Sequence, residues 1–278
     1  MSLKGRLILG AIDLLPEKHI SRAVRALAKL PAPVAVRQFA SMYNIAVDEA
    51  ELPIDAYPSV LEFFTRRLKP GLRPIDPDPK VFVSPVDGVL DATGPVDKDR
   101  ILQAKGRDYS VAALITDAAL AQPFEGGSYA TLYLSPKDYH RTHTPVSGLI
   151  SRAIYVPGAL FPVNPNAVAN VDALFANNER LVIIIESPMF GTVAYVMVGA
   201  TCVGHIKTAF DATIATNTGG RELKQHVYDP PIPVERGGEL GVFELGSTVI
   251  VVVEKGMAFD ASLAGSPVKL GQRIGTKV

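Results

Sequence analysis

The chain has 278 residues, enough for one large domain or two small ones. Hydrophobic residues make up 47% of it and charged residues 20%, which predicts a packed globular core and excludes a disordered chain. Basic and acidic residues balance at 28 each, so net charge gives no argument for a nucleic-acid partner, and we expect none. Cys202 is the only cysteine, which excludes an internal disulfide bond and fits a reducing compartment.

The first fifty residues are predicted to form short basic amphipathic helices. Residues 1–41 carry seven basic and two acidic side chains. Four basic residues share one face of a helix, at spacings of four, three and four: Lys18, Arg22, Arg25 and Lys29. Apolar residues follow another face: Ile20, Val24 and Leu27. Two interpretations stay open, a helix packed on its own domain with a solvated basic rim and a helix lying on an anionic membrane surface.

Six prolines within residues 52–80 predict a connecting arm, which contains one short helix over 60–68. The longest uncharged stretch, 187–206, is long enough to span a bilayer. However, prolines and glycines interrupt it and its centre is rich in β-forming residues, so two buried strands are the better interpretation. We expect no transmembrane helix, and residues 1–15 make a poor signal peptide because Asp13 interrupts them.

From about residue 81 the chain becomes β-rich. The expected strands are short and are divided by Gly, Pro and Asp turns: 81–84, 88–92, 128–134, 148–156, 180–186, 192–198, 201–206 and 248–254. A helix is expected over 109–121, with Ser110 as its N-cap. The pattern predicts an α+β fold, in which N-terminal amphipathic helices precede a mainly antiparallel, sandwich-like or barrel-like core.

Two of the five histidines, His140 and His143, lie three residues apart. Such a pair binds a metal only if a further ligand converges on it, and no Cys-rich or Glu-flanked pattern accompanies it, so no metal is predicted. Hydrogen-bonded imidazoles in a turn are one alternative. Acid–base catalysis is the other, since histidine changes its charge near neutral pH.

Asp87 and Ser247 are two further candidates. An aspartate before a glycine is commonly a turn residue, and the alternative is a carboxylate that fixes the tautomer of a catalytic histidine. Ser247 starts an apolar run and is flanked by Leu245 and Val249 at the positions where an α/β-hydrolase elbow has glycines. None of these features is specific when it is taken alone.

Taken together, several ordered segments between residues 57 and 254 resemble the phosphatidylserine decarboxylases of the bacterial, proenzyme type. The longest are Phe63-Phe-Thr-Arg-Arg-Leu-Lys-Pro-Gly-Leu-Arg-Pro-Ile-Asp76, Pro85-Val-Asp-Gly88, Tyr133-Leu-Ser-Pro-Lys-Asp-Tyr-His-Arg-Thr-His-Thr-Pro145, Tyr155-Val-Pro-Gly-Ala-Leu-Phe-Pro-Val-Asn164 and Leu245-Gly-Ser-Thr248. Shorter segments agree: Gln103-Ala-Lys-Gly106, Asn178-Glu-Arg180 and Val198-Gly-Ala-Thr201. Pro162 departs from the small polar residue that is frequent in the family at that position.

The resemblance implies that the protein makes its own cofactor. Ser247 would attack the carbonyl of Gly246, and β-elimination would then cleave the chain and leave a pyruvoyl group at the new N-terminus. A serine hydroxyl needs a base, and the resemblance assigns that role to His143, oriented by Asp87. Gly246 suits the reaction because it has no side chain to block the approach.

The implied mature reaction converts phosphatidylserine to phosphatidylethanolamine and carbon dioxide through a Schiff base with the pyruvoyl group. His140 is the implied proton donor, and Lys105 and Arg141 are candidate phosphate contacts.

Residues 1–50 would associate with an anionic membrane surface, and residues 51–278 would form the catalytic β-rich domain, self-cleaved between 246 and 247. The enzyme would be peripheral on the cytoplasmic face of the cell membrane, its two chains would stay together, and a homo-oligomer is left open. A serine hydrolase with the same Asp–His–Ser set and a non-catalytic lipid-binding scaffold are the alternatives, and both would stay uncleaved.

Overall fold

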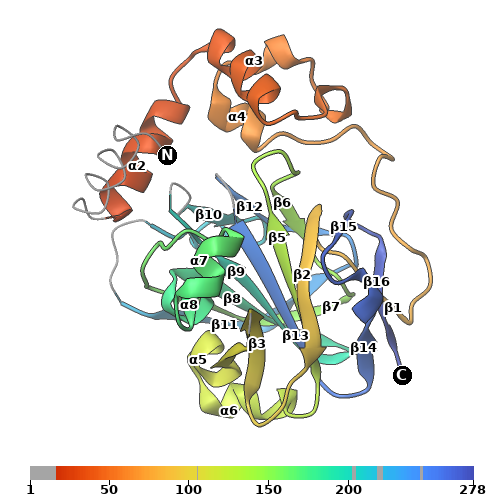
Figure 1. Ribbon diagram of the computed structural model, residues 1–278. Coiled ribbons are helices and arrows are strands. Elements are labelled where there is room, and N and C mark those ends of the chain that lie inside the picture. The colour runs from red at the N-terminus through yellow and green to blue at the C-terminus, as the bar shows by residue number, and fades with distance from the viewer. Residues whose placement is uncertain (1–16, 105, 202–204, 218–221, 245–246) are drawn as a thin grey trace.

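The computed structural model describes residues 17–104, 106–201, 205–217, 222–244 and 247–278. Helices gather at one end of a β-rich body, and further helices flank it (Figure 1). The helices and 3-10 turns are α2 (Glu17–Ala28), α3 (Pro33–Met42), η1 (Val47–Glu49), η2 (Ile54–Ala56), α4 (Val60–Phe64), α5 (Val111–Ile115), α6 (Ala118–Ala121), η3 (Gln122–Phe124), α7 (Pro165–Asn170), α8 (Leu174–Asn177) and η4 (Ala261–Leu263).

The strands of the described residues form four antiparallel sheets. The largest has the order β11 (Lys224–Val234), β7 (Gly148–Val156), β8 (Arg180–Ser187), β9 (Gly191–Val198), β13 (Ser247–Val253), β5 (Ser128–Leu134), β2 (Gly88–Pro95) and β15 (Ser266–Val268). Two sheets have three strands: β1 (Val81–Val83), β16 (Arg273–Lys277) and β14 (Met257–Phe259), and β10 (Ile206–Thr208), β12 (Glu239–Phe243) and β6 (Arg141–His143). The fourth pairs β3 (Arg100–Ala104) with β4 (Arg107–Ser110). The predicted α+β class is confirmed, and the sheets do not close into a barrel.

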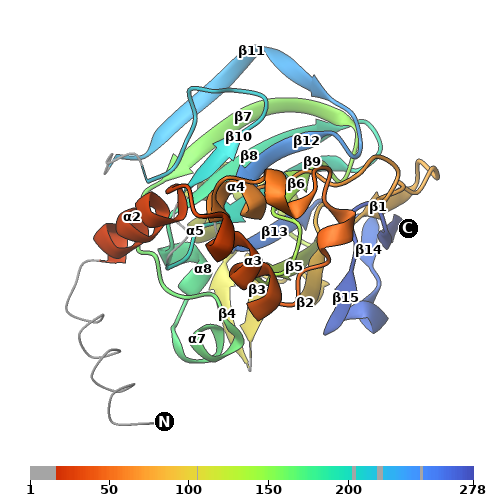
Figure 2. The same cartoon turned by 90° about the horizontal axis from the view of Figure 1, so that it is seen from above.

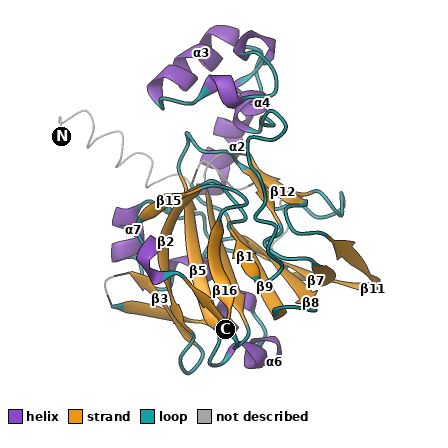
Figure 3. Ribbon diagram, turned by 90° about the vertical axis from the view of Figure 1, so that its right-hand side faces the viewer, coloured by secondary structure: helices purple, strands orange, loops and turns teal. Residues whose placement is uncertain are grey.

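The large sheet is buried on both of its faces, so it forms the middle layer of the fold. On one face Val249 and Val251 pack with residues of the two three-stranded sheets, such as Phe82 and Phe243. On the other face alternate residues of the same strands pack with residues of the β3–β4 hairpin and of α5 to α8. Figure 3 shows α7 and β3 beside β2 on this side of the sheet. All seven residues of β13 are therefore buried, which explains why its sequence is a continuous apolar run after Thr248.

The N-terminal helices α2, α3 and α4 form a small helical cap, which lies over one end of the large sheet when the molecule is seen from above (Figure 2). Val36 and Ala40 of α3 pack against Tyr57 and Phe63 in a cluster of their own. This cluster joins residues on both sides of position 50. No helix within the described residues is long and apolar enough to cross a membrane.

Seven of the eight expected strands are present to within a few residues, but the helix expected over 109–121 is broken. Ser110 caps α5 as predicted and accepts a hydrogen bond from the N–H of Ala113. The chain then turns at Thr116, whose φ of 60° is left-handed, and Asp117 caps α6 instead. The strand expected over 201–206 is not found there: Thr201 lies in a turn, residues 202–204 lie outside the described residues, and β10 begins only at Ile206.

Arg180 is a buried cation that fastens two helices to the large sheet. Its guanidinium donates to the carbonyls of Leu114 (2.6 Å) and Ala113 (2.8 Å) at the end of α5. It also donates to the carbonyls of Ala176 (2.6 Å) and Asn178 (2.8 Å) at the end of α8. Backbone carbonyls at helix ends have no partner within the helix, so one side chain here satisfies four of them.

Arg180→Met should lower the free energy of unfolding by about 3 to 5 kcal/mol, because it leaves these buried carbonyls without donors. Arg152→Met is the matched control, since Arg152 lies across the ladder from Ile184 on the next strand and is half-buried. The control should change stability by less than about 0.5 kcal/mol. Urea denaturation measures both, and equal losses would contradict the assigned role of Arg180.

Candidate functional site

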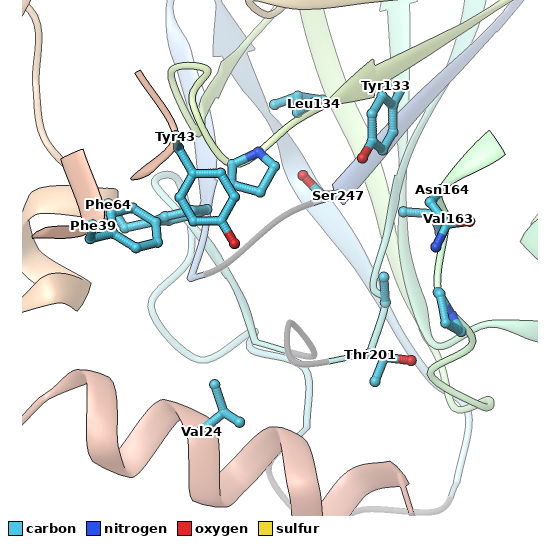
Figure 4. Close-up of a pocket in the computed structure, with 13 residues that line it drawn as sticks. Val24, Phe39, Tyr43, Phe64, Tyr133, Leu134, Val163, Asn164, Thr201 and Ser247 are labelled. Carbon is cyan, nitrogen blue, oxygen red and sulfur yellow. The ribbon is translucent and has the colours of Figure 1, made fainter. Parts of the chain in front are cut away.

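Ser247, the first residue of β13, lies in a pocket of about 400 Å³ between the N-terminal helices and the end of the large sheet (Figure 4). The lining is mostly apolar and comes from segments far apart in the sequence: Val24, Phe39, Tyr43, Phe64, Tyr133, Leu134, Pro136, Pro162, Val163, Asn164, Ala200, Thr201 and Ser247. The helical cap thus supplies one wall of the pocket, and the ends of the central strands supply the other.

The Ser247 side chain is fully buried, and its Oγ has no hydrogen-bond partner among the described residues. Its backbone position is fixed because it pairs with Leu134 of β5 while Thr248 pairs with Val198 of β9. A buried hydroxyl without a partner costs free energy, which favours a role for this group beyond packing. Gly246, the expected partner in cleavage, lies outside the described residues.

His140 is fully buried behind the wall of this pocket. Its ring centroid lies 3.9 Å from that of Phe64, which lines the pocket. Its Nδ1 is 2.9 Å from the carbonyl oxygen of Asp138, and because a carbonyl only accepts, Nδ1 carries the proton. Nε2 is then a bare acceptor, and it has no partner among the described residues. Burial lowers the pKa of His140 to about 3, so the ring is neutral.

His143 is held in the same tautomer. Its Nδ1 donates to the carbonyl oxygen of Gly237 at 2.8 Å, and its Nε2 lies 3.3 Å from the hydroxyl of Tyr139. Burial lowers the pKa of His143 below its ordinary value, although its hydrogen bond to Gly237 and the charge of Glu239 oppose the shift. The neutral ring therefore presents Nε2 as a base, currently occupied by the Tyr139 hydroxyl.

Asp87 lies in a second cavity of about 400 Å³, and Tyr133 lines both cavities. Its carboxylate accepts hydrogen bonds from Arg73 (2.6 to 3.0 Å), from the N–H of Leu270 (2.9 Å) and from Lys269 (3.3 Å). Burial by itself raises the pKa of Asp87, but these bonds and charges outweigh it and hold the pKa below its ordinary value. The carboxylate is thus charged and paired with cations.

Within the described residues no hydrogen bond joins Asp87 to His143 or His143 to Ser247. A backbone carbonyl, rather than Asp87, orients the His143 ring. Asp87 is still close enough for its charge to raise the pKa of His140. The catalytic roles of these four residues therefore stay predictions.

Of the two candidate phosphate contacts, Lys105 lies outside the described residues. Arg141 donates to the carbonyl of Thr65 (3.0 Å) and to Glu239 (2.6 Å), so its charge is already paired. Arg73, which neutralises Asp87, was not singled out from the sequence, although it stands within the family-like segment that starts at Phe63.

Comparison with known proteins adds independent information. The sequence model of the family described as phosphatidylserine decarboxylase matches residues 60–276. A phosphatidylserine decarboxylase proenzyme of Anaeromyxobacter sp. (strain K) is 50% identical over 282 residues, covering 98% of this chain and 99% of the relative. The proteins of the same name from Myxococcus xanthus (strain DK1622) and Pseudomonas fluorescens (strain Pf-5) are 48% and 42% identical, and each alignment covers at least 95% of both chains.

The free energy of unfolding should fall as the pH is lowered from about 6.5 to 5, the range just below the ordinary histidine pKa. Because the pKa values of His140 and His143 are lowered in the folded state, the unfolded chain binds more protons there, and stability is lost on acidification. The slope of the free energy of unfolding against pH should fall by up to about 1.4 kcal/mol per pH unit in His140→Gln, because one titrating group is removed. Urea denaturation in a Ser247→Ala background measures it, and an unchanged slope would contradict a neutral buried His140.

Proposed function

The chain belongs to the phosphatidylserine decarboxylase family, and from this membership we propose that it makes a pyruvoyl group from its own Ser247 and uses it on phosphatidylserine. Its class is that of a decarboxylase of phospholipid metabolism that is made as a proenzyme. The observation that carries the proposal is the Oγ of Ser247, which is buried at the start of β13 and has no hydrogen-bond partner in the part of the chain that the structure describes. Products would be phosphatidylethanolamine and carbon dioxide.

Self-cleavage begins when Ser247 Oγ loses its proton and bonds to the carbonyl carbon of residue 246. The C–N bond breaks, and the amide becomes an ester. A base then removes the Cα proton of Ser247 as the bond between Oγ and Cβ breaks, which frees a carboxylate at residue 246 and leaves a dehydroalanine. Water adds to the imine form of this dehydroalanine and supplies the ketone oxygen, and the amino nitrogen leaves as ammonia. His143 would take the first proton, since its Nε2 is the acceptor nitrogen of a neutral ring.

Two contacts must change for His143 to act in this way. Its Nε2 must leave the Tyr139 hydroxyl and approach Ser247, and Asp87 would stabilise the cation that forms. The family resemblance, rather than a hydrogen bond between these residues, supports the assignment. Behind the pocket wall, the Nε2 of His140 has no partner among the residues that the structure describes, and we assign His140 the later proton transfer at the substrate.

The surroundings of Ser247 fit a pyruvoyl group at the start of β13. Such a group, when formed, supplies a covalent electron sink for the loss of carbon dioxide from an amine substrate. The lining around Ser247 is mostly apolar, and Asn164 and Thr201 are among its polar members. Tyr43 and Tyr133 point their hydroxyls into the pocket (Figure 4).

Intact mass spectrometry of the purified protein should show two chains, residues 1–246 and residues 247–278, with the smaller blocked at its N-terminus. Ser247→Ala should remain one chain and lose decarboxylation, because the nucleophile is gone. A wild-type protein that stays whole would contradict the proposal and would favour a serine hydrolase or a lipid-binding scaffold.

We also propose that the helical cap rests on an anionic membrane surface and that the enzyme acts as a peripheral protein on the cytoplasmic face of the cell membrane. Large apolar side chains on α2, α3 and the loop between them are exposed: Leu27, Leu30, Val34 and Met42. An exposed apolar patch on a basic segment is typical of an interfacial helix. The same helices line the pocket through Val24 and Phe39, so a docked cap would bring the pocket next to the lipid.

Replacing Leu27, Leu30, Val34 and Met42 together by serine should abolish flotation with vesicles that contain phosphatidylserine, because the apolar contact with the lipid is lost. The thermal midpoint should change little, since all four side chains are largely exposed. Replacing exposed Leu102 and Leu223 by serine, both outside the cap, is the matched control. Unchanged flotation of the fourfold variant would contradict docking through this cap.

A further inference from the structure

Glu244 is a buried carboxylate that the proposed chemistry does not use. It directly follows β12, and its side chain is only 5% exposed. Its backbone N–H donates to the carbonyl of His205 at 2.9 Å. The chain is therefore anchored at Glu244 and again at Ser247, where the ladder of β13 begins, and only two residues separate these anchors.

Two cations hold the Glu244 side chain. Lys207 Nζ lies 2.6 Å from Oε1, and Arg25 Nε donates to Oε2. The Nε2 of His205 lies 4.0 Å from the same Oε2. Burial raises the pKa of Glu244, but the bonds from Arg25 and Lys207 outweigh it and lower the pKa. A charged carboxylate in this position is stable only while its partners remain.

The two cations come from different parts of the molecule. Lys207 belongs to β10, which pairs directly with β12, so it is part of the same sheet as the Glu244 anchor. Arg25 belongs to α2 of the helical cap and is 219 residues away in the sequence. Arg22, one turn earlier, bonds to Asn217 instead. The cap is thus tied by Arg25 to the chain that leads into Ser247.

The position of the segment before Ser247 matters because the serine oxygen must approach the carbonyl carbon of residue 246 within a narrow range of directions. A misplacement of about 1 Å can cost about a hundredfold in rate. Ser247 cannot easily shift to correct an error, since it pairs with Leu134 of β5 and the next residue, Thr248, pairs with Val198 of β9. On the other side of the 246–247 bond the last described residue is Glu244, so the contacts of Glu244 are the ones that can steer the carbonyl of residue 246 toward Ser247.

We propose that Arg25 and Glu244 are positioning residues for self-cleavage: α2 holds the chain on the N-terminal side of the 246–247 bond in register with Ser247. The inference rests on the proposed self-cleavage. It assigns to one basic residue of α2 a role inside the protein, in addition to any role of the cap at a membrane.

The full chain is synthesised in a cell-free system without lipid, and the appearance of the 1–246 and 247–278 chains is followed by gel electrophoresis. Arg25→Gln and Glu244→Gln should each slow cleavage at least about fivefold, and the double variant should be no slower than the slower single, because the pair acts as one unit. Arg25→Lys, which keeps the charge, should recover most of the rate. Arg22→Gln removes a charge from the same helix and should stay within about twofold of wild type.

Thermal midpoints of the same variants in a Ser247→Ala background show whether slow cleavage follows from lost stability, and we expect shifts too small to unfold the chain at the assay temperature. If wild type forms no second chain, self-cleavage itself fails. If wild type cleaves and both Gln variants match its rate, only the positioning role is overturned. Equal slowing by Arg22→Gln, or no recovery by Arg25→Lys, also overturns it.

Discussion

The pairing of β13 on both edges and its burial on both faces constrain everything else at the site. All seven residues of β13 are buried, and the strand is hydrogen-bonded to β5 on one edge and to β9 on the other. Its first residue, Ser247, is therefore held still at the point where the sheet ends and the pocket begins. In the proposed self-cleavage, the carbonyl of residue 246 therefore has to be brought to a fixed hydroxyl, whereas a serine in a mobile loop could move toward it.

Burial and backbone hydrogen bonds, rather than a carboxylate, set the charge and the tautomer of the two histidines. In both rings Nδ1 donates to a backbone carbonyl, which leaves Nε2 as the basic nitrogen. Burial keeps both rings neutral, so they are acceptors at neutral pH. Asp87 is engaged with Arg73 and Lys269, and its negative charge acts on His140 through space.

The cap combines the two interpretations that the sequence left open for its basic helices. Arg25 faces inward to Glu244, as in a helix packed on its own domain. Leu27 and Leu30, on the same helix and just beyond it, are exposed, as in a helix that contacts lipid. The helix α2 therefore lines the pocket through Val24, contacts Glu244 through Arg25 and exposes Leu27 on its outer side.

The sequence by itself determined the family, the α+β class and most strands. Short runs of β-forming residues between Gly, Pro and Asp turns mark strands locally, and motifs such as the one from Tyr133 to Pro145 are long and ordered. It also singled out Ser247 and both histidines. Only the tertiary structure decided that Gly237 orients His143, that Arg73 holds Asp87 and that Arg25 reaches Glu244. These contacts join residues from 14 to 219 positions apart, and no local pattern of spacing or hydrophobicity encodes which distant side chains the folded sheets bring together.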